Sequence, residues 1–270
     1  MKTWLITGAS RGFGLRIAQA ALDAGDRVIA TARNPRGIPL KDHPNLVLAK
    51  LDVTDEADAR QVAQSAGRID VLVNNAGFGL LGGVEEASAE EVEKLYRTNV
   101  FGLLAVTRAV LPVMRKQRSG HIINLSSIGG YRSGAGWGVY CSTKFAVEGL
   151  SEALHEELAP LGIHVTVVEP GYFRTDFLDT ASLSRAANVI PDYAETSGAV
   201  RNRAAELNHR QPGDPAKLAT ALLELAKLPN PPLRLALGSD TVKSIEDKNA
   251  FVARELATHR ALSLSTDFAS

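Results

Sequence analysis

The chain alternates short apolar segments with longer amphipathic ones. Six short segments rich in Val, Ile and Leu predict buried strands, at residues 3–7, 27–31, 46–50, 71–73, 121–125 and 164–168. Amphipathic stretches among them predict helices at residues 14–24, 54–65, 88–117 and 140–159. Strands that alternate with helices pair in parallel, with the helices lying against the sheet. We therefore expect an α/β fold, a doubly wound parallel sheet of about seven strands with helices on both faces.

The ends of three helices carry local signals. Thr54 is placed to cap the helix that runs to residue 65, and Ser88 stands three residues before Glu91, the spacing of a capping box. The glutamates of the 140–159 helix predict one solvated face; they are Glu148, Glu152, Glu156 and Glu157.

The regular alternation of strand-like and helix-like segments ends after Pro170. Residues 171–212 contain no clear strand, whereas residues 215–228 predict a helix, 233–237 a last strand and 244–262 another helix. No linker rich in Pro, Gly or Ser divides the chain. We expect one domain over residues 1–270, with a substrate lid at about 172–212 and a C-terminal helical extension at about 240–270.

Composition narrows the functional classes. The 270 residues include 30 basic and 30 acidic side chains, and this zero net charge argues against a generic nucleic-acid binder. No apolar run is long enough for a membrane span, and the first residues lack the apolar region of a secretory signal. The six histidines have no metal-ligand spacing, and Cys141, the single cysteine, suits a small buried position. We expect a cytoplasmic protein with no membrane or nucleic-acid partner.

A glycine-rich loop lies between the first predicted strand and the first predicted helix. Gly8, Gly12 and Gly14 would allow a tight turn and a close approach of backbone to a diphosphate, which the start of the helix would attract. Loops of this composition also occur as ordinary turns, but the position after a strand and before a helix is the one that phosphate binding requires.

Tyr140 and Lys144 lie four residues apart, on one face of a predicted helix. A lysine ammonium beside a tyrosine favours the phenolate and lowers the tyrosine pKa from about 10, which would make the phenol a better acid–base group near neutral pH. The same spacing occurs in surface pairs of ordinary helices, so this pair alone does not define a site.

Other motifs add to the pair. Ser127 ends the fifth strand thirteen residues before Tyr140, Asn99 lies 28 residues before Ser127, and Asn74–Gly77, Asp52 and Pro170–Gly171 follow other strands. Together with the Gly-x-x-x-Gly-x-Gly loop, these spacings resemble those of the short-chain dehydrogenase/reductase family, from residue 2 to about 176. The segment 139–150 is further similar to the branch of 17β-hydroxysteroid and retinol dehydrogenases.

The resemblance implies a Rossmann-like oxidoreductase and a role for each of four residues. Tyr140 would exchange a proton with the substrate oxygen, and Lys144 would lower its pKa and bind the nicotinamide ribose. Ser127 would hydrogen-bond the substrate oxygen, with Ser126 as a competitor for that role. Asn99 would hold a water that connects Lys144 to solvent.

The resemblance also implies a nicotinamide dinucleotide. It assigns cofactor contacts to the glycine loop (Gly8, Ser10, Arg11, Gly12, Phe13, Gly14), to the ends of the second and third strands (Arg33, Asp52, Val53), to the turn after the fourth strand (Asn75, Ala76, Gly77), to the catalytic pair (Tyr140, Lys144) and to the segment after the sixth strand (Pro170, Gly171, Phe173, Thr175).

The second strand decides which dinucleotide we expect. A carboxylate there would bind an adenosine 2′-hydroxyl, but Ala32 occupies its position, Arg33 follows and Arg11 lies in the glycine loop. Because arginine suits a 2′-phosphate, we expect NADP(H) rather than NAD(H). By the same resemblance, Asp52 and Val53 would contact the adenine, and Asn75 the adenosine-side ribose.

The substrate is less determined. Apolar and aromatic side chains favour a bulky apolar alcohol or carbonyl compound, although several of them are expected to belong to the core: Phe78, Leu80, Leu81, Tyr131, Trp137, Tyr172, Phe173, Phe177 and Leu178. Helices 88–117 and 140–159 carry surplus apolar residues, and the family resemblance implies that such helices form dimers or tetramers, so we expect a homodimer or homotetramer. Two alternatives are a non-catalytic NADP(H)-binding sensor, which would not need all four catalytic residues, and a lyase, epimerase or dehydratase on the same scaffold.

Overall fold

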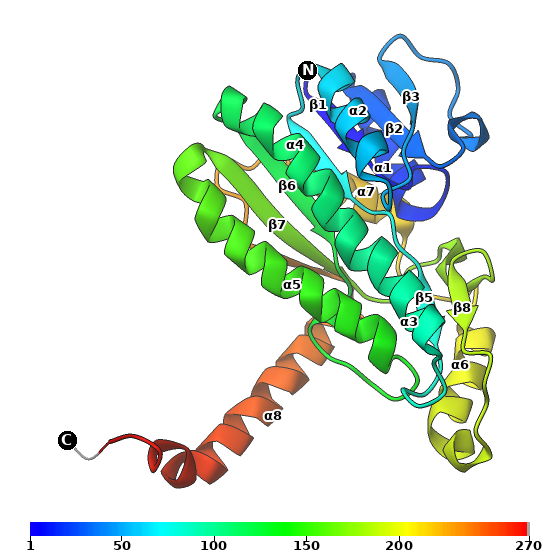
Figure 1. The fold of residues 1–270 in the computed structure, drawn as a ribbon, viewed down its shortest axis with the longest axis vertical. Helices are drawn as coiled ribbons and strands as arrows, with labels where there is room; N and C mark the ends of the chain where they lie inside the picture. Colours follow the sequence, from blue (N-terminus) through cyan, green and yellow to red (C-terminus); the bar gives the residue numbers. More distant parts are fainter. Residues whose placement is uncertain (269–270) are drawn as a thin grey trace.

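The computed structural model describes residues 1–268 and contains one seven-stranded parallel sheet (Figure 1). The strands of this sheet have the spatial order β3-β2-β1-β4-β6-β7-β9. Their bounds are β1 Thr3–Ile6, β2 Arg27–Ala32, β3 Leu46–Lys50, β4 Val71–Asn74, β6 Gly120–Leu125, β7 Ile163–Pro170 and β9 Arg234–Leu237. The order reverses direction at β1, which confirms the doubly wound α/β fold.

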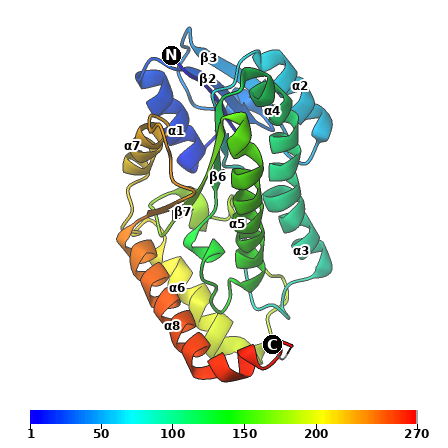
Figure 2. The same ribbon diagram turned by 90° about the vertical axis from the view of Figure 1, so that its left-hand side faces the viewer.

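Helices cover both faces of the sheet. Figure 2 shows α1 and α7 on one side and α2, α4 and α5 on the other, with the sheet between them. The helices are α1 Gly12–Asp23, α2 Glu56–Ala66, α3 Ala89–Tyr96, α4 Leu103–Gln117, α5 Gly138–Leu158, α6 Ala199–Leu207, α7 Pro215–Leu225 and α8 Ser239–Leu264. None of the helices described is long and apolar enough to cross a membrane.

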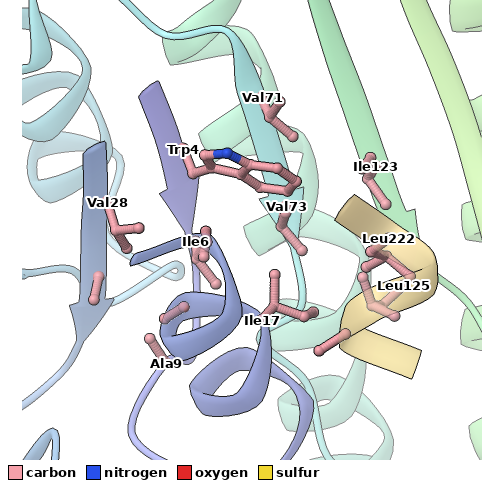
Figure 3. Packing of buried hydrophobic residues seen from close by; sticks show 14 of the residues in the cluster. Trp4, Ile6, Ala9, Ile17, Val28, Val71, Val73, Ile123, Leu125 and Leu222 are labelled. Carbon is pink, nitrogen blue, oxygen red and sulfur yellow. The ribbon is translucent and has the colours of Figure 1, made fainter. Parts of the chain in front are cut away.

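Each face of the sheet packs its own core. Trp4 and Ile6 of β1 pack with Ile17 of α1 and Leu222 of α7 (Figure 3), while Leu5 faces the opposite core with α2, α4 and α5. Successive side chains of a strand point to opposite faces, so a strand covered on both sides must be apolar at every position. This requirement explains why continuous apolar runs in the sequence predict the central strands.

Three local predictions needed correction. Asp55, not Thr54, caps α2 by accepting from the amide of Ala57, whereas the Thr54 hydroxyl bonds Asp52. The capping box of Ser88 and Glu91 is confirmed at the start of α3. The helix predicted over 88–117 is interrupted by a π-helical segment, Arg97–Gly102, and the last helix begins at Ser239 rather than at residue 244.

The 171–212 region, read as lacking strands, contains one. β8 Leu183–Arg185 pairs in parallel with β5 Gly79–Leu81, forming a second, two-stranded sheet beside the main one. The buried carboxylate of Glu86 ties the same region down, because it accepts from the Gly83 and Ile190 amides and pairs with Arg201 of α6.

The C-terminal helix α8 extends beyond the sheet (Figures 1 and 2), and only Thr241 of its residues is buried. The helical extension expected from the sequence is therefore present, although the last two residues of the predicted 240–270 range lie outside those described.

Candidate active site

A cleft of about 930 Å³ opens at the carboxyl ends of the central strands, where ligands bind in open α/β sheets. Most of the residues predicted for the site line it: Gly8, Ser10, Arg11, Gly12, Phe13, Arg33, Asp52, Val53, Asn75, Ala76, Gly77, Ser127, Tyr140, Lys144, Pro170, Gly171, Phe173 and Thr175. Gly14 and Asn99 do not line the cleft but lie directly behind its wall. No group of three metal-ligating side chains occurs within residues 1–268.

The glycine loop fits a diphosphate. Gly8 and Gly12 have left-handed φ angles of 66° and 55°, and a Cβ at Gly14 would overlap the Gly8 carbonyl and lie 2.6 Å from Asn75 Nδ2. The residue that precedes α1, Arg11, makes no side-chain cap, and the first turn of α1 carries no acidic residue. The free amides at the start of α1 thus face the cleft as a site for an anion.

Asn75 holds this loop in place. Its side-chain amide donates to the carbonyl oxygens of Thr7 (2.9 Å) and Gly8 (3.1 Å), and the Thr7 hydroxyl accepts from the Asn75 and Ala76 amides. The donors of Asn75 are therefore used within the protein, and its contact with the adenosine-side ribose stays a prediction.

The far end of the cleft carries the residues expected to choose the cofactor. Ala32 and Arg33 line it, and Arg33 is exposed. Asp52 also lines it, but its Oδ1 accepts from the amide and the hydroxyl of Thr54 at 3.0 and 2.7 Å. Arg11 is turned elsewhere, because its Nε donates to Ser182 Oγ at 2.9 Å and its terminal nitrogen to the Ala181 carbonyl.

The side chains of Ser127 and Tyr140 come together beside Gly129. A Cβ on Gly129 would lie 3.4 Å from Ser127 Oγ and 3.5 Å from Tyr140 Cε1, which are ordinary contact distances, so both side chains border this glycine. Ser127 Oγ accepts from the Gly129 amide at 3.0 Å, which fixes its position. Ser126 faces away from Tyr140, toward Glu148 across Gly130. Of the two serines, the structure brings Ser127 to the tyrosine.

Tyr140 is 7% exposed, and its ring lies between those of Trp137 and Phe177, at centroid distances of 5.8 and 5.6 Å. Burial raises the pKa of Tyr140 above its ordinary value, and a hydrogen bond with Ser127 opposes this rise. Burial, which a sequence does not display, sets the direction of this shift. The expectation that Lys144 lowers the pKa of Tyr140 stays a prediction.

Lys144 is 8% exposed, and its ammonium donates to the Leu125 carbonyl at 2.8 Å. The ammonium also lies 5.8 Å from the centre of the Tyr140 ring. Burial lowers the pKa of Lys144 to about 8, while the carboxylate of Glu148 raises it. Lys144 therefore loses its proton at a lower pH than an ordinary lysine does.

Asn99 lies in the π-helical segment between α3 and α4, a type of irregularity that often marks functional sites. Its Oδ1 accepts from the Phe78 amide, and its Nδ2 donates to the Phe78 carbonyl and to Thr143 Oγ1. A Cβ at Gly77 would lie 3.1 Å from Asn99 Oδ1 and 3.9 Å from Lys144 Nζ. Asn99 is thus placed beside Lys144, with its side chain bonded to the turn after β4 and to α5.

The segment after β7 borders the cleft together with residues that sequence reasoning missed. The ring of Phe173 packs edge-on against that of Phe13 at 5.3 Å. Asp240, at the start of α8, accepts from the Tyr172 amide at 2.7 Å, and Ser244 of α8 lines the cleft. No motif connects α8 with the site, because the contact depends on how the last strand returns the chain to the sheet.

Six of the nine candidate apolar side chains lie at the cleft, and three lie elsewhere. Phe78, Trp137, Tyr172, Phe173, Phe177 and Leu178 line the cleft. Leu80 and Leu81 are buried in the core, and Tyr131 lies in a separate hollow beside α8. Cys141 is buried at the edge of the same wall, and burial raises the pKa of its thiol.

Comparisons with known proteins identify the family of the chain. A family model described as "short chain dehydrogenase" matches residues 2–186. A 3-ketodihydrosphingosine reductase of Bacteroides thetaiotaomicron is 41% identical over 239 residues, which cover 87% of each chain. These matches bear out the family, whereas membership of the 17β-hydroxysteroid and retinol branch stays a prediction.

Solved structures give the same answer. A short-chain dehydrogenase from Streptomyces avermitilis has a TM-score of 0.91 and 42% identity, covering 99% of this chain and 100% of its own. The closed form of a serine dehydrogenase complexed with NADP⁺ has a TM-score of 0.72 and 31% identity, covering 87% of this chain and 94% of its own. The chain belongs to the short-chain dehydrogenase family and has its oxidoreductase fold.

Proposed function

We propose that the protein transfers a hydride between NADP(H) and an alcohol or carbonyl substrate with an apolar body. The observation that carries this proposal is the convergence of Ser127, Tyr140 and Lys144 in the cleft that begins at the uncapped start of α1. When bound, the nicotinamide ring supplies or accepts the hydride. The protein's own residues would bind the substrate, orient it and move the proton.

In the reducing direction, the Tyr140 hydroxyl would give its proton to the carbonyl oxygen, while Ser127 donates a hydrogen bond to that oxygen. The Lys144 ammonium, 5.8 Å from the Tyr140 ring centre, would stabilise the phenolate that remains. Asn99 would support Lys144 through its bonds to Phe78 and Thr143. In oxidation the same groups would act in reverse.

The choice of NADP(H) is supported by Arg33 at the end of β2 and by the absence of a carboxylate between residues 27 and 36. The apolar substrate is supported by the aromatic wall of Phe78, Trp137 and Phe177. The related 3-ketodihydrosphingosine reductase points to ketones with long alkyl chains as the first compounds to test.

We also propose that residues 172–212 act as the substrate lid. Arg11 of the glycine loop bonds Ser182 of this segment across the cleft, and Glu86 and Arg201 anchor its other end. Phe101 of the π-helical segment before α4 and Phe145 of α5 are exposed, which favours a homodimer or homotetramer. We expect the protein in the cytoplasm.

The test is a panel of aldehydes, ketones and alcohols, including long-chain ketones, followed by NADPH absorbance. We expect turnover by the wild type, loss of at least a hundredfold in Tyr140→Phe and little change in Tyr96→Phe. Tyr96 is a matched control because its hydroxyl bonds Ser142 outside the cleft. NADPH binding without turnover of any compound, or full activity of Tyr140→Phe, would contradict the proposal.

A further inference from the structure

A buried group of charged side chains lies behind the loop that carries Ser126 and Ser127. Arg234, the first residue of β9, pairs with Glu148 of α5, with Glu169 of β7 at 2.8 Å and with Glu152 of α5. Glu148 is 5% exposed, so the prediction that it belongs to a solvated helix face is wrong, whereas Glu152 is exposed as predicted. Three carboxylates therefore share one guanidinium, and two of them are removed from solvent.

Glu148 is connected to the catalytic residues on two sides. It follows Lys144 by four residues in α5, which places both on one face of the helix. Its Oε1 and the hydroxyl of Ser126 face one another across Gly130, where a Cβ would lie 2.8 Å from Oε1. Neither atom has a hydrogen-bond partner within residues 1–268. Ser126 and Ser127 line the catalytic cleft, so the carboxyl of Glu148 lies just behind its wall.

The charged groups around Glu148 come from α5, β7, β9 and α8. Lys144 and Glu152 share its helix, and Glu169 and Arg234 face it from β7 and β9. Lys248 of α8 lines the hollow beside α8 that Glu148 also borders. Burial raises the pKa of Glu148 to about 7, with Glu169 acting in the same direction and Arg234 against it. Above neutral pH, Glu148 therefore carries the negative charge that favours the ammonium of Lys144.

We propose that Glu148 is a positioning residue for the reaction proposed above: held by Arg234, its carboxylate keeps Lys144 protonated and steadies the Ser126–Ser127 loop. Its charge acts on Lys144 through α5, and Lys144 in turn acts on Tyr140. Without this charge, the buried ammonium would lose its proton closer to neutral pH, and the activation of Tyr140 would fail there.

The direct test measures the pH titration of Lys144 by NMR of ¹³Cε-labelled lysine. The Lys144 signal is assigned with a Lys144→Met variant. In Glu148→Gln, which keeps the shape and removes the charge, we expect the Lys144 titration to move down by about one pH unit. Glu152→Gln is the matched control, since its side chain bonds the same arginine but is 57% exposed. An unchanged Lys144 titration in Glu148→Gln would overturn the proposal.

The second readout is kcat against pH, with saturating NADPH and a substrate from the panel. We expect the alkaline limb of Glu148→Gln to move toward neutral pH by about the same amount, with a rate near that of the wild type at pH 6. An equal loss at every pH would mean a packing defect and overturn the proposal. If the wild type reduced no compound but the Lys144 titration still moved in Glu148→Gln, the proposed function would be refuted. The influence of Glu148 on Lys144 would stand.

Discussion

His121 makes the stability of the fold dependent on pH in a way that can be calculated. It lies on β6, is buried, and its Nε2 is 2.9 Å from Thr166 Oγ1. The Thr166 hydroxyl gives its own hydrogen to the Pro232 carbonyl, so it accepts from a protonated Nε2 of a neutral ring. Burial, with smaller contributions from His164 and Lys2, lowers the pKa of His121 from 6.5 to about 3.

The size of the effect follows from this difference. The unfolded chain binds a proton at His121 below pH 6.5, and the folded chain does not until about pH 3. The stabilisation is therefore fully present above pH 6.5 and is lost as the pH falls toward 3. At pH 5 the unfolded state gains a factor of about 30, which lowers the free energy of unfolding by about 2 kcal/mol.

The assay is urea unfolding at pH 7 and pH 5. The wild type loses stability between these values for several reasons, but His121→Gln, which keeps a donor for Thr166, is expected to lose about 2 kcal/mol less. His43→Gln is the control, because His43 is exposed. An equal pH-dependent loss in wild type and His121→Gln would refute the reasoning. If the variant fails to fold, an NMR titration of wild-type His121 between pH 7 and pH 4 gives the same decision, since we expect no change.

Two further predictions concern the cofactor preference of the cleft and the anchoring of the segment around residues 186–198. Arg33→Ala is expected to raise the KM for NADPH about tenfold and to leave the KM for NADH unchanged, because one exposed arginine–phosphate contact is lost; Arg36→Ala is the control, and equal effects on both cofactors would contradict the assignment. Glu86→Gln is expected to speed proteolysis of the 186–198 segment, because it weakens the buried pair with Arg201. Since hydrogen bonds from Arg201 lower the pKa of Glu86 to about 2, this anchor is present above pH 4.5 and is lost as the pH falls toward 2. Cleavage at wild-type rates would disprove its role.

The inner strands of the main sheet could be predicted from the sequence because strands buried on both faces have to be apolar at every position, whereas the edge strand β3 is partly exposed. The three-residue strands β5 and β8 could not, because their pairing joins segments about a hundred residues apart and neither is a run that stands out alone. Non-local contacts of this kind leave no local pattern.

The catalytic site follows the same division. Ser127, Tyr140 and Lys144 could be identified from their spacing, and the structure brings them together. The burial of Glu148 could not be predicted, because its partner Arg234 is 86 residues away in the chain. Nor could the hydrogen bond of Arg11 with Ser182, which joins positions 171 residues apart in the chain.

The central claim is that Tyr140 assists hydride transfer between the nicotinamide and a carbonyl carbon. The most direct measurement uses NADPH that carries deuterium at both C4 positions and mass spectrometry of the product alcohol. We predict deuterium on the carbinol carbon with the wild type, and none within the same time with Tyr140→Phe at matched NADPH occupancy. An alcohol without deuterium from the wild type, or full labelling by Tyr140→Phe, would contradict the account.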